Sequence, residues 1–209
     1  MPKPKVLILG HSFVRRFAAF IAQGVGKRVK NNLDLSESAQ IAFQGVGGRT
    51  VDKINVFDLP RVRKVQPDIV ILEIGSNDLC PRDAKPEIVG SKIETLVQHL
   101  HAHFNVKIIV VCQTIARAAC PRENPLYNDR VALLNQYLDL VLEAIPFAEF
   151  WRHKGLRKPN ISVLSKDGVH LNNRGQYALY RSYQGAILYA LKQHAAINSA
   201  AGQTGTPPA

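Results

Sequence analysis

The sequence has few of the features that mark membrane-spanning, secreted or disulfide-linked proteins. Its three cysteines, Cys80, Cys112 and Cys120, form no CxxC pair, and an odd, scattered set of this kind argues against a disulfide framework and favours a reducing compartment. No apolar run reaches the roughly 18–20 residues that cross a bilayer. The apolar block Val6–Leu9 is too short for the core of a signal peptide. We therefore expect an intracellular protein, most simply a cytoplasmic one, without a membrane anchor.

Acidic residues are scarce as well. The chain has 16 aspartates and glutamates against 27 lysines and arginines, which gives a formal net charge of +11. Such a surplus favours anionic partners, and nucleic acid, an anionic membrane surface or a charged substrate would each fit. A well-solvated surface explains the charge equally well. The basic residues gather in clusters: Arg15-Arg16, Lys27–Lys30, Arg61–Lys64 and Arg152–Lys158.

Metal-binding patterns are weak. His99 and His103 lie one helical turn apart, with His101 between them, but no carboxylate or cysteine accompanies them at a spacing suited to a metal ion. A polar helix end explains these histidines better. We expect no bound metal, and none of the motifs described below requires a cofactor.

Short apolar runs alternate with longer helical stretches, which predicts a three-layer α/β/α sandwich with a mainly parallel sheet. The run over 68–74 is nearly continuous Ile, Val and Leu, as in a sheet covered on both faces. A chain of 209 residues suits one domain, which we place at 1–194, before a disordered tail at 195–209. Strands are expected over 5–9, 39–43, 68–74, 106–112 and 147–151; helices are expected from Ser12, over 51–65 with a break at Pro60, and over 86–104, 127–144 and 173–194.

Polar or glycine-rich motifs follow four of the apolar stretches. They are Gly10-His11-Ser12, Gly47–Thr50, Gly75–Asp78 and Asp167–His170. Ligands of open parallel sheets bind beyond the carboxyl ends of the strands, so we expect the four motifs to meet at one edge. Alone, each motif would be an ordinary helix cap or turn. Their shared placement indicates a single active site.

The residue types at this edge suit acyl transfer. Ser12 is a nucleophile once a base removes its proton, and His170 is the candidate base. Asp167, three residues earlier, can orient the imidazole and stabilise its charged form. The oxyanion needs preorganised donors, and we expect the backbone N–H groups of Ser12 and Gly48 and the side-chain amide of Asn77 to supply them.

The four motifs, in this order and spacing, resemble those of the SGNH (GDSL-like) hydrolase family over about residues 5–190. Tyr127-Asn128 and Leu134-Asn135 are similar to the pattern of that family's penultimate helix. The resemblance implies a flavodoxin-like sheet, with Ser12 as nucleophile, Gly48 and Asn77 as oxyanion donors, and Asp167 and His170 as the remaining catalytic residues.

The sequence departs from the family pattern at His11, where Asp usually precedes the nucleophile. That Asp is not the acid of the triad, so we expect His11→Asp to leave activity within about an order of magnitude or to raise it. His11 could instead touch the substrate, and Arg15 and Arg16, one turn from Ser12, could bind an anionic acyl or leaving group.

These observations predict a serine esterase that hydrolyses a carboxylic ester, acetyl or short acyl, through an acyl-Ser12 intermediate. The substrate would be a small-molecule or lipid ester. The alternative is a basic module that binds RNA or an anionic membrane on an SGNH scaffold with weak or lapsed catalysis. Gly-His-Ser-Phe-Val-Arg-Arg over 10–16 and the basic charge resemble esterase-like domains of some non-LTR retrotransposons, which implies such a partner.

Overall fold

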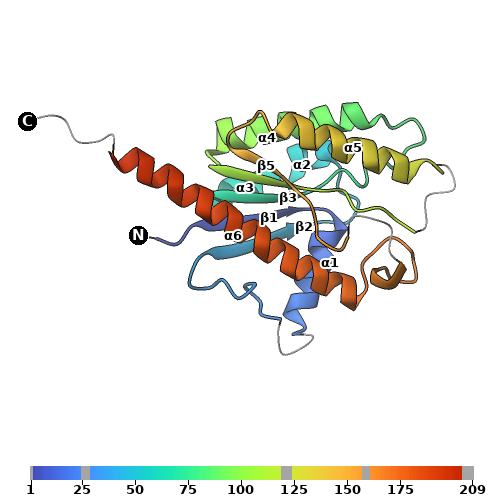
Figure 1. Cartoon of the computed structure of the whole chain (residues 1–209), viewed down its shortest axis with the longest axis horizontal. Coiled ribbons are helices and arrows are strands. Elements are labelled where there is room, and N and C mark those ends of the chain that lie inside the picture. Colours follow the sequence, from blue (N-terminus) through green and yellow to red (C-terminus); the bar gives the residue numbers. More distant parts are fainter. Residues whose placement is uncertain (1, 25–28, 119–123, 157–160, 204–209) are drawn as a thin grey trace, which may run out of the picture.

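The protein is a three-layer sandwich built on a parallel sheet (Figure 1). The computed structural model describes residues 2–24, 29–118, 124–156 and 161–203. The strand order is β2-β1-β3-β4-β5, and every neighbouring pair is parallel. This is the flavodoxin-like order, which confirms the predicted fold class. The strands are β1 (Lys5–Gly10), β2 (Gln40–Gly45), β3 (Ile69–Glu73), β4 (Ile108–Cys112) and β5 (Ala148–Trp151).

Helices cover both faces of the sheet. One face carries α1 (Ser12–Ala22) and α6 (Asn173–Gln203); in Figure 1, α6 crosses in front of the sheet. The other carries α2 (Val51–Phe57), α3 (Leu59–Val65), α4 (Pro86–Phe104) and α5 (Tyr127–Leu142). Successive side chains of a strand point to opposite faces: Val6 and Ile8 pack in the layer of α1 and α6, whereas Leu7 packs in the other layer. Two buried faces explain why the strands are continuous apolar runs.

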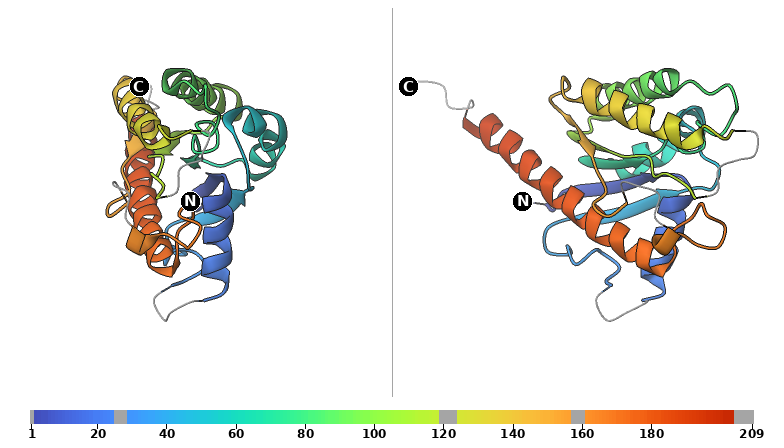
Figure 2. Two further views of the ribbon diagram at one scale, coloured as in Figure 1. Left: turned by 90° about the vertical axis from the view of Figure 1, so that its right-hand side faces the viewer. Right: turned by 45° about the vertical axis from the view of Figure 1, so that its right-hand side comes forward.

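The chain leaves the sheet at the carboxyl ends of the strands, at the right in Figure 1, and Figure 2 turns this edge toward the viewer. Ser12 begins α1 directly after β1, and the loops that follow β2 and β3 lie beside it. The crossover helices run back toward the amino ends of the strands. Loops at this edge can therefore carry functional residues without disturbing the core.

Several boundaries differ from those predicted. The N-cap of α1 is His11, and Ser12 is the first helical residue. The predicted helix over 51–65 is broken at Asp58, two residues before Pro60. The last helix continues past His194 to Gln203, so the expectation of disorder from 195 is wrong over 195–203, and 204–209 lie outside the described residues.

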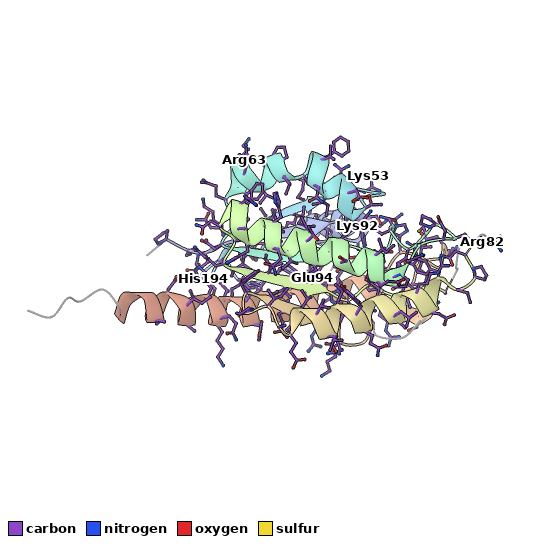
Figure 3. All side chains as sticks on the ribbon, turned by 90° about the horizontal axis from the view of Figure 1, so that it is seen from above. Lys53, Arg63, Arg82, Lys92, Glu94 and His194 are labelled. Carbon is purple, nitrogen blue, oxygen red and sulfur yellow. The ribbon has the colours of Figure 1, made fainter. Side chains whose placement is uncertain are left out.

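Several basic side chains lie on the helical layer formed by α2, α3 and α4. Figure 3 shows Lys53 on α2, Arg63 on α3 and Lys92 on α4, at separate places on the same helical layer. Lys92 pairs with Asp52 at 2.7 Å, and Arg63 lies 5.9 Å from the ring centroid of Phe104. Parts of the clusters at Lys27–Lys30 and Arg152–Lys158 lie outside the described residues. No helix in the described part of the chain is long and apolar enough to cross a membrane.

Candidate active site

Ser12, His170 and Asp167 form a hydrogen-bonded triad at the carboxyl edge of the sheet. Nε2 of His170 lies 3.0 Å from Oγ of Ser12, and Nδ1 lies 2.7 Å from Oδ2 of Asp167. The ring of Phe13 meets the imidazole edge-on at 5.9 Å between centroids. Residues 158 positions apart in sequence are thus brought to the distances that serine activation requires.

The turn Asp167–His170 holds the acid and the base together. Oδ1 of Asp167 accepts hydrogen bonds from the backbone N–H groups of Val169 and His170, each at 2.9 Å, and Gly168 takes the positive φ of +66° that the turn needs. Burial acts to raise the pKa of Asp167, but the hydrogen bonds from His170 and Val169 outweigh it and lower the pKa to about 2. The carboxylate is therefore ionised at neutral pH.

The turn Asp167–His170 is not placed by a strand of the described sheet. The motif Asp167–His170 follows no strand of the described sheet; it lies in a loop closed by an isolated antiparallel bridge between Leu164 and Leu171. The backbone N–H of Ser165 also donates to the carbonyl of His170 at 2.6 Å. A closed loop ahead of α6 positions the base where a strand was expected to do so.

His11 supports the nucleophile turn from inside the protein. Its Nδ1 accepts a hydrogen bond from the backbone N–H of Phe13 at 3.3 Å, and the side chain is 2% exposed. The predicted contact with substrate does not fit a buried capping residue. Burial lowers the pKa of His11 to about 4, against a raising effect of Glu73 and with smaller lowering effects of Arg117 and His170. His11 is therefore neutral at pH 7.

Gly10 allows β1 and β3 to approach closely at this turn. A Cβ at Gly10 would lie 2.1 Å from the carbonyl oxygen of Glu73, and the N–H of His11 donates to that same oxygen at 3.2 Å. Only glycine fits so close an approach of two backbones. The end of β3 thereby fixes the position from which Ser12 starts its helix.

The two predicted oxyanion residues come from adjacent loops. The side-chain amide of Asn77 donates to the carbonyl of Arg49 at 2.8 Å, next to Gly48. Gly48 has a φ of +71°, which favours glycine. The N–H of Val46 donates to the carbonyl of Gly10 at 3.1 Å and so joins the loop after β2 to the nucleophile turn.

A buried carboxylate, Asp58, and a half-buried one, Asp78, anchor these loops. Oδ2 of Asp58 lies 2.7 Å from Nε of Arg49, and Asp58 is 1% exposed. Asp78 accepts the N–H of Val51 at the start of α2 at 3.0 Å, and burial raises the pKa of its carboxyl. Charge-assisted bonds of this kind fix loop geometry before a substrate arrives.

The two arginines after Ser12 separate in space. The guanidinium of Arg15 lies beside Gly47, where a Cβ at Gly47 would be 3.6 Å from Cζ. Arg16 lines an open groove of about 680 Å³ between α1 and the start of α6, together with Arg174 and Gln176. From the sequence, both arginines were expected to be able to bind an anionic group, but the structure places only Arg16 in this groove.

Arg117 is a buried residue of the site that the sequence analysis missed. Its guanidinium donates to Oγ of Ser76 at 2.8 Å and to Sγ of Cys80 at 3.3 Å, and it lies 4.4 Å from the ring centroid of Tyr127. None of its hydrogen-bond partners in the described part of the chain is a carboxylate. Among the described residues, the cation therefore contacts Ser76, the neighbour of Asn77, without a paired carboxylate, and no sequence motif marks it.

Two asparagines of α5 hold the loop after β4. Asn135 accepts the N–H of Thr114 at 2.8 Å and donates to its carbonyl at 2.9 Å. Asn128 does the same for the backbone of Arg117, at 2.9 and 2.7 Å. These contacts give a physical reason for the asparagine pattern seen in the sequence: each amide satisfies both backbone groups of one loop residue.

Glu73, Cys112 and His153 are the group in the described part of the chain that could hold a metal ion, with ligand atoms within 4.8 Å of one another. Hydrogen bonds already account for much of this group. Nε2 of His153 and the hydroxyl of Tyr183 each lie 3.0 Å from Oε2 of Glu73, and Nδ1 of His153 lies 2.8 Å from Oγ of Ser182. The sequence motifs do not reveal this cluster, because its residues come from separate elements.

Comparison with solved structures shows the same fold. The chain is similar to a putative acylhydrolase from Bacteroides fragilis, with 20% identity, a TM-score of 0.67 and 91% of each chain covered. A GDSL-like lipase from Bacteroides thetaiotaomicron has 17% identity and a TM-score of 0.67, with 90% of this chain and 89% of that chain covered. An acetylxylan esterase from Geobacillus stearothermophilus has 15% identity and a TM-score of 0.64, with 93% and 95% covered. No curated protein matches the sequence significantly.

The profile of the GDSL-like lipase/acylhydrolase family matches residues 8–178, from β1 into the first turns of α6. This range includes all four motifs found in the sequence. It confirms the predicted resemblance and, with it, the prediction of an ester hydrolase. The chain belongs to the GDSL-like lipase/acylhydrolase family.

Proposed function

We propose that this chain is a serine esterase that cleaves an acetyl or short acyl ester through an acyl-Ser12 intermediate. The observation that carries the proposal is the hydrogen-bonded row of Ser12, His170 and Asp167, with distances of 3.0 and 2.7 Å. This row has the geometry of nucleophile, base and orienting acid in acyl transfer.

In the first step, Oγ of Ser12 attacks the ester carbonyl while Nε2 of His170 takes its proton. Asp167 stabilises the resulting imidazolium. The oxyanion is proposed to accept hydrogen bonds from the N–H groups of Ser12 and Gly48 and from the amide of Asn77. The N–H of a residue in the first helical turn has no intrahelical partner, and the amide nitrogen of Asn77 carries a second hydrogen besides the one donated to Arg49.

The tetrahedral intermediate then collapses. His170 donates its proton to the departing alcohol, and the acyl group stays on Ser12. A water molecule, deprotonated by His170, attacks the acyl-serine and releases the carboxylic acid. Every proton in this cycle passes through one imidazole, so the proposed steps need only protein groups and one water molecule.

A hollow of about 450 Å³ next to Asn77 is our candidate for the acyl site. Ala84, Ile88 and Val89 supply apolar wall, whereas Asp78 and Lys92 make part of it polar. A wall of this mixed character suits an acetyl or short acyl chain better than a long one.

The test is hydrolysis of p-nitrophenyl acetate, butyrate and octanoate by the wild type, by Ser12→Ala and by the control Ser36→Ala, which alters an exposed loop serine. We expect Ser12→Ala to abolish turnover and labelling by a fluorophosphonate probe, the control to keep both, and the acetate to be preferred. Unchanged turnover in Ser12→Ala would rule out the proposed nucleophile.

The alternative of a basic module that binds RNA or an anionic membrane stays a prediction. The hydrogen bonds that join Ser12, His170 and Asp167 are intact, which favours an active enzyme over a scaffold that has lost catalysis. Salt-dependent binding of RNA or anionic vesicles by Ser12→Ala, with no turnover of any ester by the wild type, would favour the alternative.

A further inference from the structure

The groove that holds Arg16 begins one helical turn from the nucleophile. Ser12, Arg16, Ala19 and Gln23 recur at helical spacing, so they share one face of α1. The last three line the groove, whose volume is about 680 Å³. A substrate bonded to Ser12 can therefore extend along this stripe without crossing the helix.

The opposite wall of the groove is continuous with the catalytic base. Leu171 and Asn172, which directly follow His170, line it, and the first turns of α6 add Arg174 and Gln176. Because one wall continues from Ser12 along α1 and the other directly follows His170, the groove adjoins the proposed catalytic residues.

Positive charge dominates this groove. Arg16 and Arg174 line it, and among the residues that the structure describes no carboxylate does. Neither arginine forms an ion pair with a carboxylate of the described residues. Guanidinium groups bind phosphate through paired N–H donors, and two unpaired cations match the charge of a phosphate monoester.

Gln176 adds a second, independent indication of a ligand. The residue is 4% exposed, and its Oε1 has no hydrogen-bond partner in the described part of the chain. A buried acceptor without a donor is unfavourable. The atom is closed to solvent in the observed side-chain conformation, but Gln176 lines the groove, and a rotation of its side chain would bring Oε1 to a ligand hydroxyl there.

The chemistry of the reaction decides which half of the ester lies here. His170 must hand its proton to the leaving alcohol, so the alcohol lies on the side of the imidazole. The oxyanion donors Gly48 and Asn77 belong to the loops after β2 and β3, on the other side of the nucleophile turn. The groove next to His170 therefore receives the alcohol half.

We infer that the alcohol half of the substrate carries a phosphate group and a hydroxyl. Arg16 and Arg174 bind the phosphate, and the side-chain oxygen of Gln176 accepts a hydrogen bond from the hydroxyl. This inference rests on the proposed esterase function. Ser12 Oγ forms a bond to the acyl carbon, the bond from that carbon to the alcohol oxygen breaks, and the proton of Ser12 reaches the alcohol oxygen through His170. The phosphorylated alcohol leaves, and water releases the acyl group as a carboxylic acid.

A matched pair of esters tests the inference: 1-acetylglycerol 3-phosphate and uncharged 1-acetylglycerol, with acetate release as the readout. We expect the wild type to prefer the phosphate ester in kcat/KM by about tenfold or more at low salt, and the preference to shrink as salt rises. Arg16→Gln and Arg174→Gln should each reduce this ratio by several fold, and the double variant should abolish it.

Arg15→Gln is the matched control, since it removes the same charge one residue away and outside the groove. It should retain the wild-type ratio. Equal kcat/KM for the two esters in the wild type, or an equal loss of preference in Arg15→Gln and Arg16→Gln, would overturn the inference.

A binding measurement separates failure of the inference from failure of the esterase proposal. Calorimetry with glycerol 3-phosphate on Ser12→Ala should show binding that Arg16→Gln and Arg174→Gln weaken. If the wild type hydrolyses neither ester but this binding is found, the groove assignment holds and the esterase proposal fails. If esters are hydrolysed but glycerol 3-phosphate does not bind, the inference fails and the esterase proposal stands.

Discussion

Nε2 of His153 lies 3.0 Å from Oε2 of Glu73, and both side chains are completely buried, at 0% exposure. The same carboxylate oxygen accepts the hydroxyl of Tyr183 at 3.0 Å. Ser182 lies 2.8 Å from the other ring nitrogen of His153 and accepts the indole N–H of Trp151 at 3.0 Å. A polar network thus runs from the surface of α6 to the end of β3, directly below the nucleophile turn.

Removing the imidazole should leave the buried carboxylate without its main partner. We expect His153→Ala to lower the free energy of unfolding by about 3–5 kcal/mol, since breaking one side of a buried hydrogen-bonded pair leaves the other side without its partner. Guanidinium denaturation checks this. In the double variant Glu73→Met/His153→Leu, most of the loss should be recovered, because no buried charge remains. A His153→Ala protein within about 1 kcal/mol of the wild type would contradict the expectation.

Stability should depend on the protonation of His11. The pKa is lowered from 6.5 to about 4 by burial, so the unfolded chain binds a proton more readily than the folded one between these values. Stability is therefore complete above about pH 6.5 and falls as the pH drops toward about 4, by on the order of 3 kcal/mol. Unfolding curves at pH 7, 5.5 and 4.5 measure this slope.

His11→Asn keeps a capping side chain but cannot titrate. Its stability should therefore vary less between pH 7 and 4.5 than that of the wild type, whereas the exposed control His103→Asn should leave the slope unchanged. The same slope in wild type and His11→Asn would show that another group is responsible. His11→Asp, which restores the usual family residue, should still keep activity within about an order of magnitude, since Asp also caps helices well.

Arg117 should act through the position of Ser76 and Asn77. Its guanidinium donates to both the carbonyl and the hydroxyl of Ser76, so Arg117→Met should loosen the loop that presents Asn77. We expect kcat to fall by about tenfold, less than the roughly 10²–10³ for a lost oxyanion donor, with little change in KM. Arg117→Lys should restore less than half of the loss, because lysine lacks the planar fork. A change confined to KM would contradict this positioning role.

Gly90 lies where α4 meets α5. A Cβ at this position would lie 2.3 Å from the ring of Tyr137. Alanine normally stabilises a helix interior by about 1 kcal/mol relative to glycine, but here overpacking should prevail, and Gly90→Ala should destabilise by about 1–3 kcal/mol. In a Tyr137→Ala background, Gly90→Ala should instead stabilise the protein, because the ring with which it clashes is gone. Thermal unfolding of the four proteins checks the sign, and destabilisation in both backgrounds would exclude the clash as its cause.

The sequence was most informative where one local rule sufficed. The apolar runs at Val6–Leu9 and Ile108–Cys112 predicted buried strands because both faces of the sheet are covered. Pro86 marked the start of α4. Ser12, Asp167 and His170 were predicted from chemistry and resemblance, and the structure brings them together. Their proposed roles stay predictions until the variants are measured.

Long-range partners could not be read from the sequence. Nothing in the local pattern shows that Arg117 stacks on Tyr127 across the loop between β4 and α5, or that Glu73 meets His153, 80 positions later in the chain. Charge alone did not distinguish Arg15 from Arg16; the rotation of one residue around α1 places only the second in the groove. The end of α6 was also missed, since small and polar residues after His194 continue the helix without a core to pack against.

The extended last helix has a practical consequence. α6 starts beside His170 and runs the full length of the sheet, and its last turns project beyond the amino ends of the strands, on the side where β1 begins (Figure 1). The start of β1 and the end of α6 thus both lie at the end of the molecule opposite the catalytic edge. Immobilising the enzyme at the start of β1 or at the end of α6 would turn Ser12 and the groove toward the solution. The tethered protein should therefore turn over substrate at about the rate of the dissolved protein.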